Sequence, residues 1–189
     1  MPPKRAAGDK AWIQGLLAKH EGPLTRYVSR LLGDVERARE VVQESFLRLL
    51  EAKRSDIDGH VTEWLFTVCR NRAIDLKRRD RRQLPLAEGV EIPAEESESP
   101  SAFLESAQKQ RSLLHALTKL PANQREVIRL KFQEELSYRE ISRIMGLSES
   151  NVGYLIHTAI KTMREETKKE EIESGQRSKQ PMAPQGGER

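Results

Sequence analysis

Two stretches of the chain combine side chains that suit contact with nucleic acid. The first, RNRAIDLKRRDRR at residues 70–82, holds seven basic residues and two acidic ones. On one helix these charges form an electrostatic footprint for phosphates, although the helix dipole also favours Lys and Arg at any solvated helix C-terminus. Just upstream, Trp64 and Phe66 could stack on unpaired bases or fill a core. We expect Phe66 in the core and keep both interpretations of Trp64.

The second stretch, SYREISRIMGLSESNVGYLIHTAIKTMR at residues 137–164, predicts two helices joined by a tight turn. Ser137 and Glu140 have the spacing of a capping box, which starts the first helix. Gly146 can adopt the left-handed conformation that ends it, and Ser148 can cap the next helix. The pattern predicts a helix-turn-helix whose second helix enters the major groove. The alternative is an ordinary helical hairpin within a bundle.

The second of these helices has two distinct faces in its sequence. Its predicted buried stripe consists of Val152, Ile156, Ala159, Ile160 and Met163. A polar stripe on another face consists of Ser150, Tyr154, His157, Thr158 and Lys161. A helix patterned in this way packs by one side and offers the other to a partner.

The distribution of charge along the chain places residues 70–82 and residues 137–164 in two separate basic blocks. Residues 1–82 carry 18 basic and 12 acidic side chains, and residues 106–170 carry 12 basic and 8 acidic ones. Between these blocks, residues 83–105 hold six Glu, three Pro and no Lys or Arg. Such a segment cannot bury enough apolar surface to fold alone, so we expect a flexible acidic linker.

The predicted fold class is all-α, with two small helical domains joined by the flexible acidic linker. We expect a disordered N-terminus over 1–11, the first domain over 12–82, the linker over 83–105, the helix-turn-helix domain over 106–167 and a disordered tail over 168–189. Helical periodicity runs through both blocks, and no alternating strand pattern lasts long enough to count.

In the first block, Gly33 and Asp34 predict a helix stop followed by an N-cap. One or two helices are expected from Trp12 to Leu32, interrupted near Gly22-Pro23, and another from about Thr62 to Arg79.

The periodicity also predicts which side chains these helices bury. The helix after Asp34 is predicted to bury Val35, Ala38, Val42, Phe46, Leu49 and Leu50. The helix after the loop at 53–61 is predicted to bury Leu65, Val68, Cys69 and Leu76. In the second block, one short helix is predicted to use Leu113, Leu114, Leu117 and Leu120, and the next, begun by Pro121, to carry Val127, Ile128, Leu130 and Phe132.

Several classes of protein are excluded by composition. The chain has no apolar run near the ~20 residues of a membrane helix, and its first residues lack the apolar stretch of a secretory signal. We therefore expect a cytoplasmic protein without membrane insertion. The single cysteine, Cys69, excludes an internal disulfide and is interpreted as a small buried hydrophobe rather than a redox sensor. Four dispersed His and the lack of a nucleophile elbow, phosphate loop or HExxH helix predict no metal site, no cofactor and no catalysis.

Both blocks together resemble bacterial sigma factors of the extracytoplasmic function type. DVERAREVVQESFLRLLEA at residues 34–52 is similar to the family's polymerase-binding helix. VTEWLFTVCRNRAIDLKRRDRR at residues 61–82 is similar to its helix for opening and reading the −10 promoter element. LPANQREVIRLKFQEELSYREISRIMGLSESNVGYLIHTAIKTMR at residues 120–164 is similar to its −35-binding domain. The resemblance implies core RNA polymerase, promoter DNA and an anti-sigma protein as partners.

The resemblance also implies roles for residues of the first block. A pocket for a flipped −10 base would lie in the loop from Lys53 to Val61. The implied −10 contacts are Asp56, Asp58, His60, Trp64, Arg70, Asn71, Arg72, Lys77, Arg78 and Arg79. The implied polymerase contacts are Asp34, Glu40, Gln43, Glu44 and Arg48, while Phe46 is assigned to the core.

The recognition helix departs from the family's pattern. That helix is usually rich in Arg and Lys, whereas SESNVGYLIHTAIKTMR at 148–164 has only Lys161 and Arg164. We expect Arg125, Arg139 and Arg143 to supply phosphate contacts instead. The plausible base readers are Ser150, Asn151, Tyr154 and His157. Asn151 is a candidate because Asn can bond adenine bidentately. Ser148 at the cap and Lys161 further along the helix complete the expected −35 contacts.

Two other functions stay open at this point. A conventional helix-turn-helix regulator would bind operator duplexes without polymerase, but the first block shows no ligand pocket pattern. A nucleic-acid-processing enzyme would need clustered carboxylates for a metal, and Asp56 with Asp58 are too few.

Overall fold

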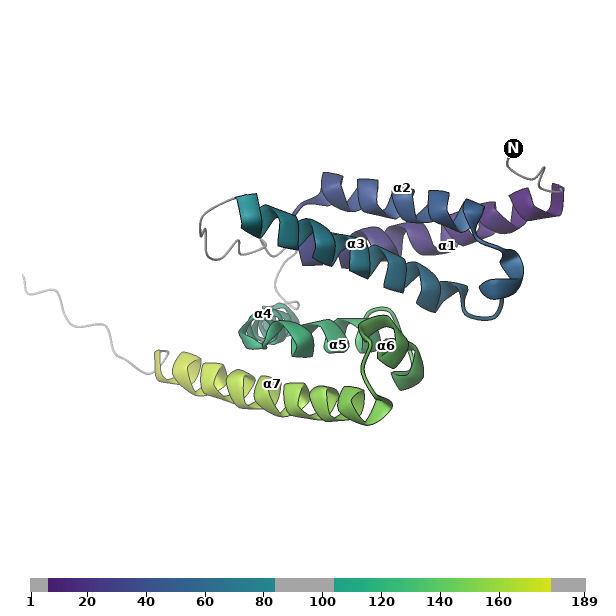
Figure 1. The fold of residues 1–189 in the computed structure, drawn as a ribbon. Helices are drawn as coiled ribbons and strands as arrows, with labels where there is room; N and C mark the ends of the chain where they lie inside the picture. Colours follow the sequence, from purple (N-terminus) through teal and green to yellow (C-terminus); the bar gives the residue numbers. More distant parts are fainter. Residues whose placement is uncertain (1–6, 84–103, 178–189) are drawn as a thin grey trace, which may run out of the picture. The chain divides into compact units, whose positions relative to one another are not determined.

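The computed structural model describes residues 7–83 and 104–177, and every regular element within these ranges is helical. Figure 1 shows the helices of each block. The predicted all-α class with a helix-turn-helix in the second block is confirmed. The predicted linker lies almost entirely outside the described residues.

The first block is a bundle of three long helices in which each helix packs against the other two. Its elements are α1 (Ala7–Leu32), α2 (Val35–Glu51), the short 3-10 helix η1 (Arg54–Asp56) and α3 (Val61–Gln83). Tyr27 of α1 and Phe66 of α3 meet with ring centroids 5.2 Å apart, which confirms the core position of Phe66. Trp64 is half-buried, so it has both a packed and an open side.

Helix α1 corrects two predictions from the sequence. It begins at Ala7, inside the stretch assigned to a disordered N-terminus, and it runs through Pro23 without a break. Proline lacks the N–H that would bond the carbonyl of Lys19, so the helix gives up one backbone hydrogen bond there. The fully buried side chains of Leu24 and Val28 follow directly, and their burial holds the next turn in helical form.

The junction between α1 and α2 is the one that the sequence predicts. Gly33 has φ 77°, and the Asp34 carboxylate accepts the backbone N–H of Arg37 at 3.1 Å. The predicted inward face of α2 is wrong at its two ends, since Val35 is 50% exposed and Leu50 is 39% exposed. Val35 is the first residue of the helix, and Leu50 lies 100° around the axis from the buried Leu49.

Cys69 lies in the core of the first block. Its thiol is buried and donates to the Ser45 hydroxyl at 3.2 Å. Burial raises the pKa of Cys69 to about 11, and it outweighs the bond to Ser45, which acts in the opposite direction. A thiol with this pKa is protonated at neutral pH, which agrees with its interpretation as a small hydrophobe.

The described residues 104–177 of the second block form four helices. They are α4 (Leu104–Lys119), α5 (Ala122–Phe132), α6 (Tyr138–Met145) and α7 (Glu149–Arg177). Its buried apolar side chains are Ala116, Leu117, Leu120, Val127, Ile128, Leu130, Leu136, Ile141, Ile144, Val152, Leu155, Ile156 and Ala159. Three side chains predicted to face inward are exposed instead, namely Leu113, Leu114 and Phe132.

Three predicted boundaries shift. Helix α3 ends at Gln83 rather than near Arg79, and α4 begins at Leu104, inside the stretch assigned to the linker. Helix α7 continues to Arg177, so residues 168–177 are helical where a disordered tail was predicted. The sequence of this extension is strongly polar, which is why it does not show the apolar periodicity that marks a helix.

Candidate nucleic-acid interface

The turn between α6 and α7 is built from the residues that the sequence singles out. Ser137 accepts the backbone N–H of Glu140 at 3.2 Å, and the Glu140 carboxylate accepts the N–H of Ser137 at 2.7 Å. Gly146 takes the left-handed conformation, with φ 68° and ψ 36°. Ser148 then accepts the N–H of Asn151 at 3.2 Å, which caps α7. All three local predictions are confirmed.

The polar face of α7 is open to solvent. Tyr154 is 66% exposed, although it follows two residues after the fully buried Val152. The other predicted base readers and the predicted cap are exposed as well: Ser148, Ser150, Asn151, His157 and Lys161. Leu155, Ile156 and Ala159 form the buried side, so the helix is fixed by one face and presents the other.

The arginines expected to bind phosphate near this helix differ in availability. Arg139 is exposed on α6, and Arg143 is exposed as well but donates to the Glu63 carboxylate at 2.6 Å. Arg125 is half-buried, and its guanidinium donates to the backbone carbonyls of Thr118 at 2.6 Å and Leu120 at 3.0 Å. It therefore satisfies the C-terminal carbonyls of α4, which makes it a structural residue more than a phosphate ligand.

The loop between α2 and α3 has a defined conformation. Ile57 is buried and anchors it, and Gly59 turns it with φ 80°. The guanidinium of Arg54 lies 4.7 Å from the centre of the Trp12 ring, which ties η1 to the start of α1. The predicted −10 contacts of this loop are thereby held outward, with Asp56 and Asp58 exposed and His60 half-buried.

The basic helix α3 uses part of its charge inside the bundle. Asn71, Lys77, Arg78 and Arg79 are exposed, while Arg70 and Arg72 are half-buried. Arg72 donates from Nε to the Glu44 carboxylate at 2.7 Å. The structure thus joins two residues that the family pattern assigns to separate surfaces, Arg72 to DNA and Glu44 to the polymerase.

A second ion pair joins the far end of α3 to α2. Arg37 donates to both carboxylate oxygens of Asp80, at 2.8 and 3.2 Å. This hydrogen-bonded pair lowers the pKa of Asp80 and raises the pKa of Arg37. Together with the bond from Arg72 to Glu44, it fixes the direction in which the basic turns of α3 point.

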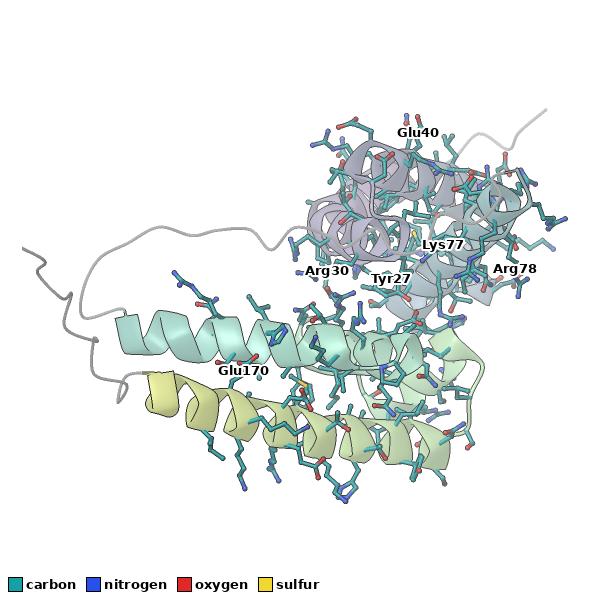
Figure 2. All side chains as sticks on the ribbon, turned by 90° about the vertical axis from the view of Figure 1, so that its left-hand side faces the viewer. Tyr27, Arg30, Glu40, Lys77, Arg78 and Glu170 are labelled. Atoms are coloured by element: carbon teal, nitrogen blue, oxygen red, sulfur yellow. The ribbon has the colours of Figure 1, made fainter. Side chains whose placement is uncertain are left out.

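The predicted polymerase contacts lie on α2. Glu40, Gln43 and Arg48 are exposed, and Figure 2 shows Glu40 at the outer surface of the first block. Glu44 is half-buried between Arg48, at 2.8 Å, and Arg72. Asp34 is occupied as the N-cap of α2.

Beside these residues lies an apolar groove that the sequence does not reveal. The groove has a volume of about 410 Å³ and is lined by Ile13, Leu17, Glu21, Thr25, Arg39, Val42, Gln43, Phe46, Leu47 and Leu50. Leu47 is 56% exposed, and Leu17 and Leu50 are each 39% exposed. The one hint of this groove in the sequence is Leu47, an apolar residue that lies off the buried stripe of α2.

Two family models match the chain, one for each block. Sigma-70 region 2 covers residues 16–83, and Sigma-70, region 4 covers residues 110–163. Regions 2 and 4 in this order define a promoter-recognition subunit of RNA polymerase.

Three similar proteins are sigma factors, and the two from Mycobacterium tuberculosis and Bacillus subtilis are of the extracytoplasmic function (ECF) type. The sigma factor SigL of Mycobacterium tuberculosis strain H37Rv is 30% identical over 161 residues, which is 84% of this chain and 90% of that protein. SigM of Bacillus subtilis strain 168 is 30% identical over 128 residues, covering 67% and 77% of the two chains. RpoE of Bartonella quintana, solved with the anti-sigma factor NepR, shares the fold with a TM-score of 0.59 at 20% identity, over 82% of this chain and 96% of that one.

The chain belongs to the extracytoplasmic function group of RNA polymerase sigma factors. It directs RNA polymerase to promoters and is not itself an enzyme. The resemblance, fold class and function predicted from the sequence are confirmed. Among the described helices, none combines the length and the apolar composition that crossing a membrane requires.

Proposed function

We propose that this sigma factor divides promoter reading between the start of α7 and the loop preceding α3. The open polar face of α7, fixed in place by the capped turn, supports its entry into the major groove of the −35 element. Asn151 and Tyr154 lie within the first two turns of the helix, where base edges are closest. Arg139 on α6 would bind the adjacent phosphates, and Arg143 would join it by exchanging its bond to Glu63 for one to phosphate.

In this proposal the first block holds the melted −10 strand. The anchored loop offers Asp56, Asp58 and His60 to an unstacked base, and Trp64 and Asn71 lie further along on α3. The exposed cations of α3 hold the backbone of that strand: Lys77, Arg78 and Arg79. Arg70 and Arg72 are assigned to the same surface, with Arg72 acting through its bond to Glu44.

The polymerase would bind along α2. Glu40, Gln43 and Arg48 supply exposed polar groups, and Leu47 beside them lines the apolar groove. A polar rim around an apolar centre is the common composition of a protein interface. Glu44 lies at its edge, and Asp34 fixes the start of the helix that carries it.

An anti-sigma protein could cover the same surface. The related structure of RpoE contains such a partner, NepR. The groove along α2 exposes apolar side chains on the first block, and covering it would block the polymerase. Because the protein works with RNA polymerase, we place it in the cytoplasm.

A crossed selection experiment tests the division of labour. The holoenzyme selects active promoters from a library with randomised −10 and −35 elements, using wild type, Asn151→Ala and the double variant Asp58→Ala/His60→Ala. We expect Asn151→Ala to relax base preference at one or two −35 positions and to leave the −10 preference unchanged. The double variant Asp58→Ala/His60→Ala is expected to relax base preference in the −10 element and to leave the −35 preference unchanged.

The matched control is Asn123→Ala, which removes the same side chain from an exposed position at the start of α5. It should leave both preferences as in wild type. Relaxation of the −10 preference by Asn151→Ala, or of the −35 preference by Asp58→Ala/His60→Ala, would contradict the proposed division.

A further inference from the structure

Helix α7 continues beyond the part of the chain that the family model covers. The match to region 4 ends at residue 163, whereas the helix ends at Arg177. The stretch from 164 to 177 is rich in charged residues, so apolar burial cannot by itself explain why it is helical.

The inner side of this extension is fastened to α4. Half-buried side chains recur at the helical spacing of Met163, Glu166, Thr167 and Glu170, which continues the buried stripe of α7. The Glu170 carboxylate is hydrogen-bonded to Ser112 and to Nδ1 of His115, both on α4. These bonds lower the pKa of Glu170. Figure 2 shows Glu170 between the two helices.

The outer side of the same helix carries a row of cations. His157, Lys161, Arg164 and Lys168 follow one another at intervals of four, three and four residues, so they share one face of α7. With Ile160 and Glu165 they line a shallow groove of about 290 Å³. Lys161, Arg164 and Lys168 are exposed and outnumber the single carboxylate of Glu165, so the row is positive. We call these three cations the basic stripe.

The basic stripe continues the reading face. Tyr154 lies three residues before His157 on the same side, so base readers and cations form one line along the helix. At 1.5 Å per residue, Lys168 lies ~21 Å from Tyr154 along the axis. The major groove is only ~12 Å wide, so a helix that reads bases at Tyr154 must cross the groove's edge before Lys168.

We propose that the basic stripe binds the sugar-phosphate backbone of duplex DNA that borders the −35 element. The inference rests on the proposed function of α7 and adds a phosphate-binding surface to it. The recognition helix is poor in cations near its start, and Arg125 is committed to the carbonyls of α4. The extension supplies the missing charge, and its bonds to α4 keep the stripe aligned with the reading face.

A polyanion suits this surface better than a protein partner. Protein interfaces are centred on desolvated aromatic or aliphatic anchors. The groove offers only the half-buried Ile160 at that place, and the rest of its lining is charged or imidazole. Nucleic-acid contacts to phosphate need cations and no apolar centre.

Salt dependence measures the phosphate contacts directly. Holoenzymes made with each variant are titrated with a −35-containing duplex between 50 and 300 mM salt, and the slope of log K against log salt is compared. Counterion release predicts that each lost phosphate contact reduces this slope by about 0.9. We expect Lys168→Ala to reduce it by about that amount and Arg164→Ala/Lys168→Ala by about 2. The variant Lys168→Arg keeps the positive charge, so it should show the wild-type slope.

Lys169→Ala is the matched control. Lys169 is the next residue of the same helix, carries the same charge and is bonded to Glu166 at 2.7 Å on another face. Its replacement should leave the slope unchanged. Equal slopes for wild type, Lys168→Ala and Lys169→Ala would overturn the inference, and so would a loss of core polymerase binding by Lys168→Ala in a native gel.

The two proposals fail separately in this experiment. A wild-type holoenzyme that binds matched and scrambled −35 duplexes equally would refute the reading function of α7, whatever the slopes are. A wild type that discriminates between them, with Lys168→Ala showing the wild-type slope, would refute the basic stripe alone.

Discussion

Helices α3 and α7 are both long, both charged and both assigned to DNA, but α3 carries more cations and uses one of them, Arg72, in a bond inside its bundle. Helix α3 has seven basic residues over 70–82, but Arg72 is bonded to Glu44, and Asp80 on the same helix is bonded to Arg37. Helix α7 has fewer cations, and its outer row of Lys161, Arg164 and Lys168 is exposed along one line. The number of cations in a segment therefore does not give the number that stay exposed for phosphate, because packing within the fold uses some of them.

The segments that precede the two helices differ as well. The loop before α3 is eight residues long from Lys53 to His60 and is held by the buried Ile57. The turn before α7 is short and is held by backbone conformation at Gly146 and by the cap at Ser148. A melted strand needs a shaped pocket, whereas a duplex needs a straight helix at a fixed angle, and the two connections suit these tasks.

The largest expected effect comes from removing the exposed cations of α3. Lys77→Ala/Arg78→Ala/Arg79→Ala should weaken holoenzyme binding to a single-stranded −10 oligonucleotide on the order of 100-fold at 0.1 M salt. Three contacts at a slope of about 0.7 each for single strands give a loss of about 2 in the salt slope. Fluorescence anisotropy at several salt concentrations measures both quantities. An unchanged slope would show that the charge of α3 serves the fold and not the strand.

The next effect concerns the glycines that precede each DNA-facing helix. Gly59 and Gly146 have positive φ and open space around the position of a Cβ, so alanine there meets backbone strain alone. We expect Gly59→Ala and Gly146→Ala each to lower the free energy of unfolding by about 1–2 kcal/mol. Chemical denaturation measures this change.

Gly15→Ala is the control for the glycine variants. Gly15 lies inside α1, and apart from the helix's own nearby backbone and its chain neighbours no atom lies within 4 Å of its Cβ position, so alanine should raise stability by roughly 0.5–1 kcal/mol. Equal effects at all three positions would mean that the left-handed turns are not maintained in solution.

A smaller effect tests the bond between α2 and α3. A double-mutant cycle with Glu44→Ala and Arg72→Ala should give a coupling of about 0.5–1 kcal/mol, because the pair is hydrogen-bonded but partly exposed. The same variants separate two roles, since loss of polymerase binding by Glu44→Ala but not by Arg72→Ala would place Glu44 in the interface. A coupling of zero would remove Arg72 as a positioning residue.

The smallest effect is a dependence on pH at the end of α3. Its bond to Arg37 lowers the pKa of Asp80 in the folded state, so the ionised carboxylate stabilises the fold above the ordinary Asp pKa. That contribution is lost as the pH falls through the lowered value. We expect Asp80→Asn to reduce Tm slightly at pH 7 and to match wild type in strong acid. A difference in Tm that grows as the pH falls would contradict the assignment.

The local features of the second block were predictable because they depend on nearest neighbours. Ser137 with Glu140, the left-handed Gly146 and the cap at Ser148 each act within four residues, so the sequence carries the whole interaction. The exposed face of α7, with Tyr154 at its centre, follows from helical periodicity alone. The candidate −10 and −35 residues came from the family pattern and stay predictions.

Features that depend on packing were not predictable. The bond from Arg72 to Glu44 joins residues 28 positions apart and requires the bundle to exist. The groove beside Leu47 is lined by side chains of both α1 and α2, so it exists only when the two helices are packed together. The extension of α7 is held by the contact of Glu170 with α4, which no periodicity in a polar stretch reveals.

Footprinting of promoter DNA with and without core polymerase tests the central claim most directly. We predict that the full chain alone leaves promoter duplex unprotected and that adding core polymerase produces protection over the −35 element with base unstacking at −10. Tight, sequence-specific protection by the chain alone, unaltered by core polymerase, would contradict the account and identify an operator-binding regulator.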